Sequence, residues 1–291
     1  MKFTKMHGIG NDYIYINGFA ETVDDPSALA VKMSAYHTGV GADGIILILP
    51  SDTADLRMRM FNSDGSEAQM CGNGARCVAR YAYERGLIDK TSFTMETGGG
   101  IRQLEIILDE DSPERVKAVR VDMGVPVWTP SKIPAALDGE AVVERAIELV
   151  GRTFPMTCLS MGNPHAVLFV EEDPFTLKGF EAYGKMLENH EWFPERVNVE
   201  FVQRVSDSHI RMRVWERGSG ETLACGTGAC AAAVAAKRTG RVRGDSTKVT
   251  LRGGELSIAW PGMGQPVSMT GPAAFVFDGE WFRCDCRRCY S

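Results

Sequence analysis

An internal repeat constrains the fold of this chain more than any other feature of its sequence. Residues 61–86 align without a gap with residues 215–240, at an offset of 154. The aligned positions include a set of identical pairs: Glu67/Glu221, Cys71/Cys225, Gly72/Gly226, Gly74/Gly228, Ala75/Ala229, Ala79/Ala233 and Gly86/Gly240. Such self-similarity indicates that a structural unit has been duplicated.

Further short motifs recur in the same order and support the duplication. Gly10-Asn11 recurs as Gly162-Asn163 at an offset of 152, and the glycine pair at 99–100 recurs at 253–254, at an offset of 154. Residues 123–126 resemble residues 270–272 less closely. Independent use of strand–glycine–helix turns is the alternative, but it does not explain the shared order. We therefore expect two halves of about 150 residues, related by a pseudo-twofold axis, whose equivalent cysteines approach one cleft.

Hydrophobic periodicity predicts many strands and few helices. The expected strands are residues 13–16, 45–49, 56–61, 93–95, 104–108, 116–123, 166–170, 199–201, 209–215, 248–251, 256–260, 267–269 and 274–277. The expected helices are 27–36, 74–85, 140–150, 175–188 and 228–239. This excess of strands predicts an α+β fold with mixed sheets, and the proline-flanked residues 126–134 are a candidate linker.

Length and charge exclude several classes of function. A chain of 291 residues favours two domains over one. Its 38 acidic and 32 basic residues give a net charge of −6 and form no basic stripe, so we expect no nucleic-acid partner. No polybasic run and no apolar segment of membrane-spanning length occur, so we expect no membrane association. Without a signal-peptide pattern at the start, a cytoplasmic location is the expectation.

Two of the eight cysteines lie in a pattern that suits chemistry. Cys71 and Cys225 each begin the pattern Cys-Gly-x-Gly-Ala, which is followed by a predicted helix. The glycines allow a tight turn close to a ligand, and the free N–H groups of the helix start can bind a carboxylate. The same helix start stabilises a thiolate, so we expect the pKa of each thiol to fall below its usual value of about 8.5.

Together the two cysteines suggest a two-base inversion of an amino-acid α-carbon. One thiolate removes the α-proton, the other thiol protonates the opposite face, and amides at both helix starts stabilise the negative charge on the substrate carboxylate. This scheme requires neither a metal nor an organic cofactor. Either cysteine alone would more simply be a buried residue at a turn, but the matched pair favours catalysis. Cys77 and Cys230 fall inside the predicted helices and are expected in the core.

Several polar residues are candidates for contacts with a substrate. His165 follows a Gly-Asn-Pro turn and precedes an apolar strand, so both a structural role and a role in the site remain open. Glu216 and Arg217 could form a surface ion pair, but their repeat counterparts are Asn62 and Ser63. A site that reads a substrate with one reacting end requires such asymmetry. The asparagines could all be turn residues, or their amides could reach a cleft: Asn11, Asn62, Asn163 and Asn198.

Taken together, these motifs resemble those of the diaminopimelate epimerase family. The matching segments span essentially residues 1–280: KMHGIGNDY at 5–13, GVGADG at 39–44, FNSDGSE at 61–67, CGNGARC at 71–77, SMGNPH at 160–165, ERVN at 195–198, ERGSGETLACGTGA at 216–229 and MTGPA at 269–273. In combination they are highly specific.

The resemblance implies a fold, an activity and a set of residue roles. It implies two pseudo-symmetric domains, each with mixed β-structure around a central helix and with the active site in the cleft between them. The N-terminal domain would comprise residues 1–122 together with 271–291, and the C-terminal domain residues 123–270. The implied activity is interconversion of LL- and meso-diaminopimelate, on the route to lysine and peptidoglycan, by a homodimer.

The resemblance also assigns residues within that site. Cys71 and Cys225 match the catalytic base and acid. The backbones of Gly72, Asn73, Gly226 and Thr227 match positions that hold the reacting carboxylate. Positions that bind the substrate, largely at its distal end, are matched by Asn11, Asn62, Asn163, Asn198, Glu216 and Arg217. His165, like Glu216, matches a polar residue near the reacting centre.

Two departures and two rival functions accompany this resemblance. Some family members carry Gln where this chain has Gly44, and the tail with Cys284, Cys286 and Cys289 lies outside the family pattern. Three thiols at these spacings are a poor zinc site, so a weakly packed tail is the simpler interpretation. The rivals are another two-cysteine isomerase, such as a proline or hydroxyproline epimerase, and a non-catalytic amino-acid-binding module. The polar distal residues disfavour the first, and retention of both cysteines disfavours the second.

Overall fold

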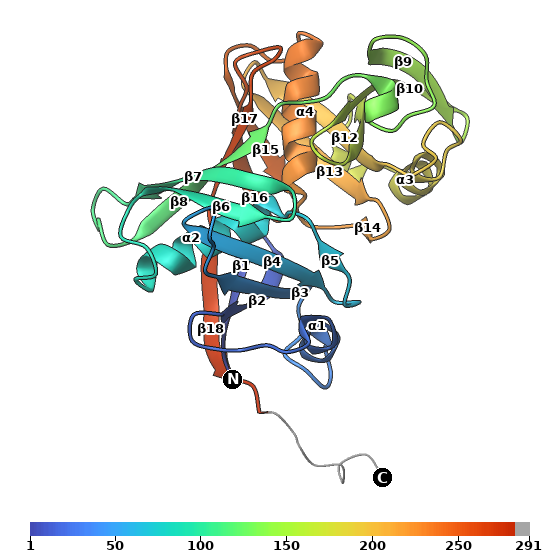
Figure 1. The fold of residues 1–291 in the computed structure, drawn as a ribbon. Coiled ribbons are helices and arrows are strands. Elements are labelled where there is room, and N and C mark those ends of the chain that lie inside the picture. Colours follow the sequence, from blue (N-terminus) through green and yellow to red (C-terminus); the bar gives the residue numbers. More distant parts are fainter. Residues whose placement is uncertain (283–291) are drawn as a thin grey trace, which may run out of the picture.

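The computed structural model describes residues 1–282, so the cysteine tail lies outside the described residues. The first half of the chain forms β1 (Lys2–Gly8), β2 (Asn11–Asn17), α1 (Pro26–Ser34), β3 (Gly44–Leu49), β4 (Leu56–Asn62), β5 (Glu67–Ala68), α2 (Gly72–Glu84), β6 (Ser92–Thr97), β7 (Gly100–Leu108) and β8 (Val116–Gly124). Figure 1 shows these elements gathered mainly in one lobe around α2.

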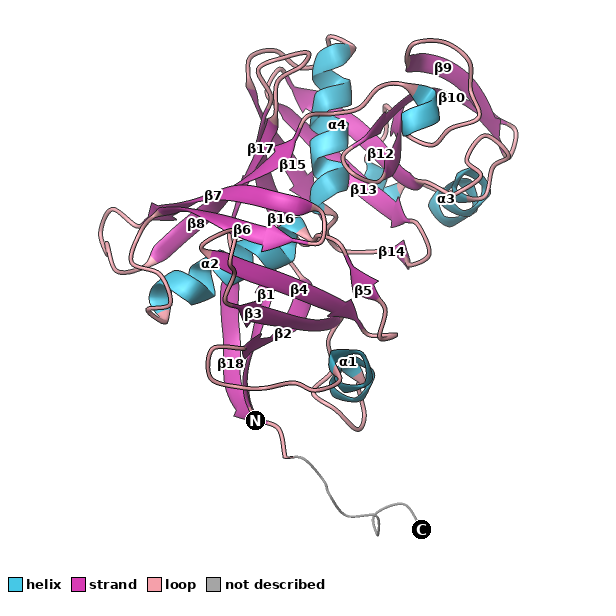
Figure 2. Ribbon diagram, in the orientation of Figure 1, coloured by secondary structure: helices cyan, strands magenta, loops and turns pink. Residues whose placement is uncertain are grey.

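The second half repeats this order with a few additions. It forms η1 (Pro130–Lys132), β9 (Val142–Leu149), β10 (Arg152–Ser160), β11 (Pro164–Phe169), η2 (Pro174–Thr176), α3 (Phe180–Glu188), β12 (Asn198–Ser206), β13 (His209–Glu216), β14 (Gly220–Glu221), α4 (Gly226–Arg238), β15 (Ser246–Leu251), β16 (Gly254–Ala259), β17 (Val267–Gly271) and β18 (Ala274–Glu280). Figure 2 shows that strands dominate both lobes and that one long helix runs through each.

Strand register carries the repeat into three dimensions. In the first half Ile45 of β3 lies opposite Phe61 of β4, and in the second half Val199 of β12 lies opposite Trp215 of β13. Both partners are displaced by the 154 residues that separate the repeats. The parallel pairing of β4 with β6 is likewise repeated by that of β13 with β15. The same residue spacing therefore specifies the same ladder twice.

The two halves meet at β8 and β17, which are equivalent strands. Each follows a hairpin partner, β7 or β16, and they pair with each other in antiparallel orientation, with Val121 opposite Met269. The strand that follows each of them joins the other half, because β9 pairs with β10 and β18 pairs with β1. We retain the division into residues 1–122 with 271–291 and residues 123–270 as a proposal; it cuts the chain near the ends of these two strands.

The central helices α2 and α4 are enclosed by sheet, and one apolar cluster contains residues of both. Helix α4 has an almost continuous run of alanines at 229–236, nearly all fully buried. Alanine favours the helix and lacks a bulky side chain, so strands can approach α4 from several sides. This enclosure fixes where each helix begins, and the helix beginnings carry the repeated cysteines.

The helix expected at 140–150 is wrong, because these residues form strand β9 paired with β10. Val142 and Ile147 are both buried although they lie five positions apart, a spacing that a regular strand places on opposite faces. A register shift and a positive φ of 52° at Glu144 form a β-bulge that brings both side chains inward. The apolar spacing imitated a helix because the bulge added one residue.

Other boundaries differ from expectation in smaller ways. The helix expected at 175–188 begins only at Phe180, after a 3₁₀ turn and Gly179 at a φ of 79°. Strands β1 and β10 were not predicted, since β1 is short of continuous apolar residues and β10 contains Pro155. Along residues 1–282, no helix combines the length and apolar composition needed to cross a membrane.

Candidate active site

Cys71 and Cys225 occupy the same position at the start of α2 and α4. Each is the N-cap residue of its helix, and each sulfur accepts a backbone hydrogen bond, from Gly74 at 3.3 Å and from Gly228 at 3.4 Å. The free N–H groups of a helix start are normally satisfied by Ser, Thr, Asp or Asn. Here a thiol takes that role, so the positive end of each helix faces a sulfur atom.

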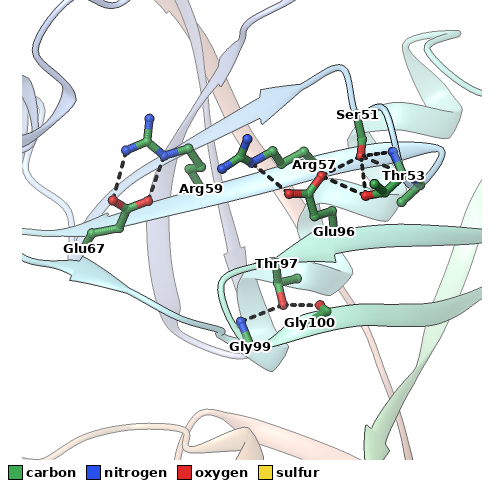
Figure 3. Close-up of polar contacts among 10 residues, drawn as sticks. Ser51, Thr53, Arg57, Arg59, Glu67, Glu96, Thr97, Gly99 and Gly100 are labelled. Atoms are coloured by element: carbon green, nitrogen blue, oxygen red, sulfur yellow. Dashed lines mark hydrogen bonds and ion pairs between the residues drawn. The ribbon is translucent and has the colours of Figure 1, made fainter.

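Equivalent ion pairs, one in each half, hold the segments that lead into the two cysteines. Arg59 on β4 forms a two-pronged contact with Glu67 on β5, at 2.7 and 2.9 Å (Figure 3). In the second half Arg213 on β13 forms the equivalent pair of hydrogen bonds with Glu221 on β14, both at 2.8 Å. Such bidentate pairs restrict direction as well as distance. The identical Glu67 and Glu221 of the repeat thus anchor the approach to both cysteines.

The repeated glycine pairs lie beside the same segments. The N–H of Gly99 donates to the carbonyl of Gln69 at 3.0 Å, and the N–H of Gly253 donates to that of Leu223 at 2.9 Å. Figure 3 shows Gly99 also bonded to the Thr97 hydroxyl, which closes the β6–β7 turn. Both glycine turns therefore fix a carbonyl two residues before a cysteine.

A network around Asn73 brings the two cysteine motifs together. Its side-chain amide donates to the carbonyl of Ala224, the residue before Cys225, at 3.3 Å. Met269 lies against both helix starts, since a Cβ placed on Gly72 would lie 2.5 Å from its Cε and one on Gly226 would lie 3.2 Å from its sulfur. Glycine at these positions allows the two helix starts to converge on one place.

Asn11 connects this network to Cys71. Its side-chain oxygen accepts from the Cys71 thiol at 3.5 Å and from the Asn73 amide at 3.3 Å. Its NH₂ group donates to the carboxylate of Asp43 at 2.7 Å, and this contact fixes the orientation of the Asn11 amide. Burial raises the pKa of Asp43. The sequence did not single out Asp43 as a supporting residue.

In the second half His165 belongs to a polar chain in which it and Glu200 are fully buried. Its Nδ1 is 2.7 Å from Oε1 of Glu200, and its Nε2 is 2.9 Å from the side-chain oxygen of Asn163. The Asn163 amide donates in turn to the Thr227 hydroxyl at 3.3 Å. The Thr227 hydroxyl lies 3.5 Å from the sulfur of Cys225. This chain links a buried carboxyl group to the start of α4.

Glu216 lies near the second cysteine. Burial raises the pKa of its carboxyl group, and hydrogen bonds from the side chains of Thr222 and Cys225 oppose that shift. Asn198 orients the chain after Glu216 because its oxygen accepts from the N–H of Arg217 at 2.9 Å. Its amide donates to the carbonyl of Pro164, also at 2.9 Å. The loop that starts with Glu216 is therefore tied to the turn before β11.

The side chains of Arg217 and Asn62 form their hydrogen bonds outside the network around the two cysteines. The Arg217 guanidinium donates to the carbonyl of Glu195 at 3.1 Å, in an exposed contact. The Asn62 amide donates to the hydroxyl of Ser66 at 3.0 Å. Neither side chain has a recorded hydrogen bond to another candidate site residue within residues 1–282, so their assignment rests on the resemblance rather than on a contact.

Both thiols have a pKa above the ordinary value, which contradicts the sequence expectation. Burial raises the pKa of Cys71, and backbone hydrogen bonds from Gly74 and Asn73 together with the charge of Arg76 oppose the rise. Burial raises the pKa of Cys225 well above its usual value, and Glu216 and Glu200 reinforce the rise. The helix start acts in the expected direction, but removal from water has the larger effect.

Sequence reasoning missed several residues that organise this site. Glu200 is fully buried in β12, and Arg76 is fully buried on α2. Glu188 accepts from the N–H of Gly218 at 2.7 Å and so holds the loop after Arg217. A signal was present for Glu200, because it is the charged residue among the apolar residues of 199–202. Among residues 1–282, no group of three or more His, Cys, Asp and Glu side chains is arranged to hold a metal ion.

Comparison with known proteins identifies the family. A family model described as diaminopimelate epimerase matches residues 3–129 and 157–276. The chain belongs to the diaminopimelate epimerase family. The predicted family and enzyme class, an amino-acid isomerase, are therefore confirmed.

Curated diaminopimelate epimerases are similar along their whole length. The chain is 50% identical over 281 residues to that of Acetivibrio thermocellus, covering 96% of this chain and 98% of the relative. It is 51% identical over 284 residues to that of Desulforudis audaxviator, covering 97% and 100%. The Methanococcus maripaludis enzyme of strain C6 is 48% identical over 281 residues, covering 96% and 99%.

Solved structures of other proteins share the fold. A phenazine biosynthesis protein of the PhzF family from Bacillus anthracis superimposes with a TM-score of 0.71 at 17% identity, covering 97% of this chain and 99% of that chain. A hydroxyproline epimerase from Agrobacterium vitis, with bound trans-4-hydroxy-L-proline, gives 0.69 at 17% identity, covering 96% and 91%. The predicted fold class, α+β with two pseudo-symmetric halves, is confirmed.

Proposed function

We propose that this chain interconverts LL- and meso-diaminopimelate by a two-base mechanism in which Cys71 and Cys225 exchange protons with one α-carbon. The observation that carries the proposal is the pair of thiols that cap adjacent helix starts, joined through the contact of Asn73 with Ala224. The near-complete coverage of relatives named diaminopimelate epimerase supports the choice of substrate.

In the proposed reaction the proton transfers occur on opposite faces of the α-carbon. The thiolate of Cys71 removes the α-proton of the LL isomer, and the electron pair left behind is delocalised into the adjacent carboxylate. The thiol of Cys225 then delivers its proton to the other face, which inverts the centre. The enzyme is left with a thiol at Cys71 and a thiolate at Cys225, the arrangement that the reverse reaction requires.

The helix starts supply stabilisation for the charge that develops on the carboxylate. The N–H groups of Gly74 and Gly228 are directed to the sulfurs. We assign the carboxylate to the preceding amides of the two first turns: Gly72, Asn73, Gly226 and Thr227. Donors held in place before the reaction stabilise the transition state without reorganisation, and removal of one such donor typically costs about 10²–10³ in rate.

We assign recognition of the distal amino-acid end to polar side chains. The proposed contacts come from Asn11, Asn62, Asn163, Asn198, Glu216 and Arg217. Arg217 supplies a cation for the distal carboxylate, and the carboxylate of Glu216 suits an ammonium group. We place His165 as a supporting residue, because Glu200 and Asn163 occupy both of its ring nitrogens.

Isotope exchange provides the decisive test. Incubation of the reduced protein with LL-diaminopimelate in heavy water should place deuterium at one α-carbon and accumulate the meso isomer. Cys71→Ala and Cys225→Ala should each lower the rate by at least about 10²-fold, the smallest usual contribution of a positioned acid or base. Near-normal turnover in either variant would remove that cysteine from the mechanism.

Two other outcomes would select a rival function. Turnover of proline or hydroxyproline, with diaminopimelate left unchanged, would identify another two-cysteine epimerase. Binding of diaminopimelate without deuterium incorporation would identify a binding module instead of an enzyme. Nuclear magnetic resonance of the recovered amino acid separates these cases, because it reports both the label and the isomer.

We also propose that the protein acts in the cytoplasm, in the synthesis of lysine and peptidoglycan precursors. Reducing conditions there keep thiols free, and Cys71 and Cys225 are both free cysteines. Cell fractionation with detection of the chain would test this placement, and recovery outside the cytoplasm would contradict it.

A homodimer is the proposed assembly, and β18 is the strand that we place at its interface. Strands β9 and β18 occupy equivalent edge positions, because within residues 1–282 each pairs with a single strand, β9 with β10 and β18 with β1. The exposed face of β9 carries charged residues at 144, 145 and 148 and a bulge, features that block edge-to-edge pairing. On β18, Val276 and Phe277 are 52% and 45% exposed. Strand β18 also has a bulge, at Val276, and exposed charges at Asp278 and Glu280, but its exposed apolar pair makes it the more apolar edge, which suits a second copy.

A further inference from the structure

The two halves place different chemical groups at the same position behind their cysteines. A Cβ built on Gly74 would lie 2.6 Å from a methyl group of Ile46, whereas one on Gly228 would lie 2.8 Å from Oε1 of Glu200. Ile46 and Glu200 are separated by the repeat offset of 154 residues. Behind the glycine that donates to Cys71 there is thus a hydrocarbon, and behind the one that donates to Cys225 there is a carboxyl group.

A second difference lies one turn into the helices. Arg76 on α2 is fully buried, and the equivalent residue on α4 is Cys230. The guanidinium donates to the side chain of Asn73 at 2.9 Å and to the carbonyls of Pro272 and Gly72 at 3.1 and 3.3 Å. Within residues 1–282 no carboxylate is among the groups that interact with its charge, although burial of an unpaired charge is costly.

The surroundings of Arg76 leave one candidate for its negative partner. The ionisable groups that interact with its charge are Cys77, Cys71, Tyr15 and Cys230. Burial raises the pKa of Cys77 to about 11 and that of Cys230 to about 12, and it raises the pKa of Tyr15 well above its usual value. Burial raises the pKa of Cys71 too, but among these four groups Cys71 is the one that caps a helix start, where its sulfur accepts from the N–H of Gly74 at 3.3 Å. Cys71 is therefore the group whose thiolate is best placed to balance the buried cation.

Around Cys225 the charged groups have the opposite sign. Glu216 on β13 and Glu200 on β12 both disfavour a thiolate there. His165 on β11 faces Glu200 at 2.7 Å, and the second carboxyl oxygen of Glu200 is buried with no hydrogen-bond partner among the described residues. Around Cys71 the corresponding groups are Arg76 and, more weakly, Glu216, with the neutral Tyr13 hydroxyl nearby. The duplicated site is therefore electrically unequal.

We propose that Arg76 and Glu200 are positioning residues that make Cys71 the first of the two cysteines to lose its proton and keep Cys225 in its thiol form. The inference rests on the two-cysteine function proposed above and adds the residues that break its symmetry. Neither side chain has to touch the substrate, because each acts through the helix start that it supports. The protein thereby prepares the α-proton acceptor on one face and the donor on the other before substrate arrives.

Site-specific alkylation measures this assignment without reference to turnover. The full chain is first reduced, and the reductant is then removed. The protein is treated with iodoacetamide from about pH 6 to about pH 10, and mass spectrometry measures the alkylation of each cysteine. Only thiolates react rapidly, so the rate reports the thiolate fraction. In the unaltered protein Cys71 should titrate at lower pH than Cys225. At pH 7, Arg76→Met should slow alkylation of Cys71 about tenfold, and Glu200→Gln should speed that of Cys225 by a similar factor, as expected for shifts of one pKa unit.

Matched variants separate charge from structure. Arg76→Lys retains the cation and should restore most of the Cys71 reactivity, whereas Arg80→Met, one turn farther along α2, should leave both profiles unchanged. Circular dichroism establishes that each variant is folded. If Arg76→Met does not fold, Glu200→Gln and Arg76→Lys still decide the matter, because Glu200→Gln preserves shape while removing the acid.

The outcomes distinguish this inference from the proposed function. Unchanged alkylation profiles in folded Glu200→Gln and Arg76→Met, or a lower titration pH for Cys225 than for Cys71 in the unaltered chain, would overturn the inference even if diaminopimelate is epimerised. Shifted profiles together with no turnover of diaminopimelate would leave the electrical asymmetry standing and would reject the proposed substrate.

Discussion

At the scale of single residues, two opposing effects act on the site thiols. Backbone N–H groups at a helix start stabilise a thiolate, whereas burial removes the water that would otherwise solvate it. Burial has the larger effect at both cysteines, but Cys71 also feels the cation of Arg76, while Cys225 feels two carboxyl groups. The pair is thus suited to exchanging one proton, with a thiolate that forms more easily on one side.

The raised pKa of Cys71 gives a prediction for pH dependence. A thiol whose pKa lies above the ordinary value is mostly protonated near pH 7, and its thiolate fraction grows as pH rises. We therefore expect kcat/KM for LL-diaminopimelate to rise about tenfold per pH unit on its acid limb and to reach its maximum on the alkaline side of neutrality. Initial rates across the pH range check this. A value of kcat/KM that stays constant between about pH 6 and about pH 8 would contradict this prediction.

At the scale of elements, close backbone approach sets where the helices begin. The β15–β16 turn contacts the β1–β2 turn across the two halves, and a Cβ built on Gly253 would lie 1.9 Å from the carbonyl oxygen of Ile9. In the equivalent β6–β7 turn, a Cβ on Gly99 would meet its nearest neighbour, on Met70, at 3.6 Å. The two turns therefore occupy equivalent positions in the repeat but differ in their tolerance for a side chain.

This difference gives a paired prediction. Gly253→Ala should lower the free energy of unfolding by about 1–3 kcal/mol, because the methyl group collides with backbone that cannot move aside easily. Gly99→Ala should change stability little, since its methyl group has ordinary van der Waals space. Chemical denaturation of both variants measures the contrast. Equal stability losses would show that the contact between the two turns is not tight.

At the scale of the whole molecule, the exchange of β9 and β18 ties the halves together. Strand β9 follows β8 of the first half but pairs with β10 of the second, and β18 follows β17 of the second half but pairs with β1 of the first. Neither half therefore forms its full sheet from a continuous stretch of chain. The N-terminus consequently lies beside the end of β18, where the N–H of Trp281 donates to the carbonyl of Met1 at 2.8 Å (Figure 1). The exchange also creates two equivalent edges, β9 and β18, of which β18 exposes the larger apolar side chains, Val276 and Phe277.

The exposed apolar edge of β18 gives the prediction for assembly. A lysine on an exposed apolar edge opposes pairing with a second chain. Val276→Lys on β18 should therefore shift the molecular mass in solution from dimer to monomer, whereas Val143→Lys on the equivalent β9 should have no effect. Light scattering coupled to size-exclusion chromatography reports the mass. A dimer that persists in Val276→Lys would place the interface elsewhere.

The sequence by itself determined the repeat, the helices α2 and α4, and the placement of Cys71 and Cys225 at equivalent helix starts. These features depend on local spacing: glycines that permit a turn, alanines that favour a helix, and alternation that specifies a strand. Strand register repeats at the same offset of 154 because equal spacing produces equal ladders. Local physics therefore predicted the half-unit and the candidate catalytic pair.

Only the tertiary structure decided which groups surround that pair and how they change it. Glu200 meets His165 across two parallel strands, and Arg76 reaches Pro272 from almost two hundred residues away in the chain. The same holds for β9, where a bulge against β10 overrides a helical apolar pattern. Burial and long-range pairing depend on which segments meet, and the chain order of residues does not encode that directly. The raised thiol pKa values follow from this enclosure.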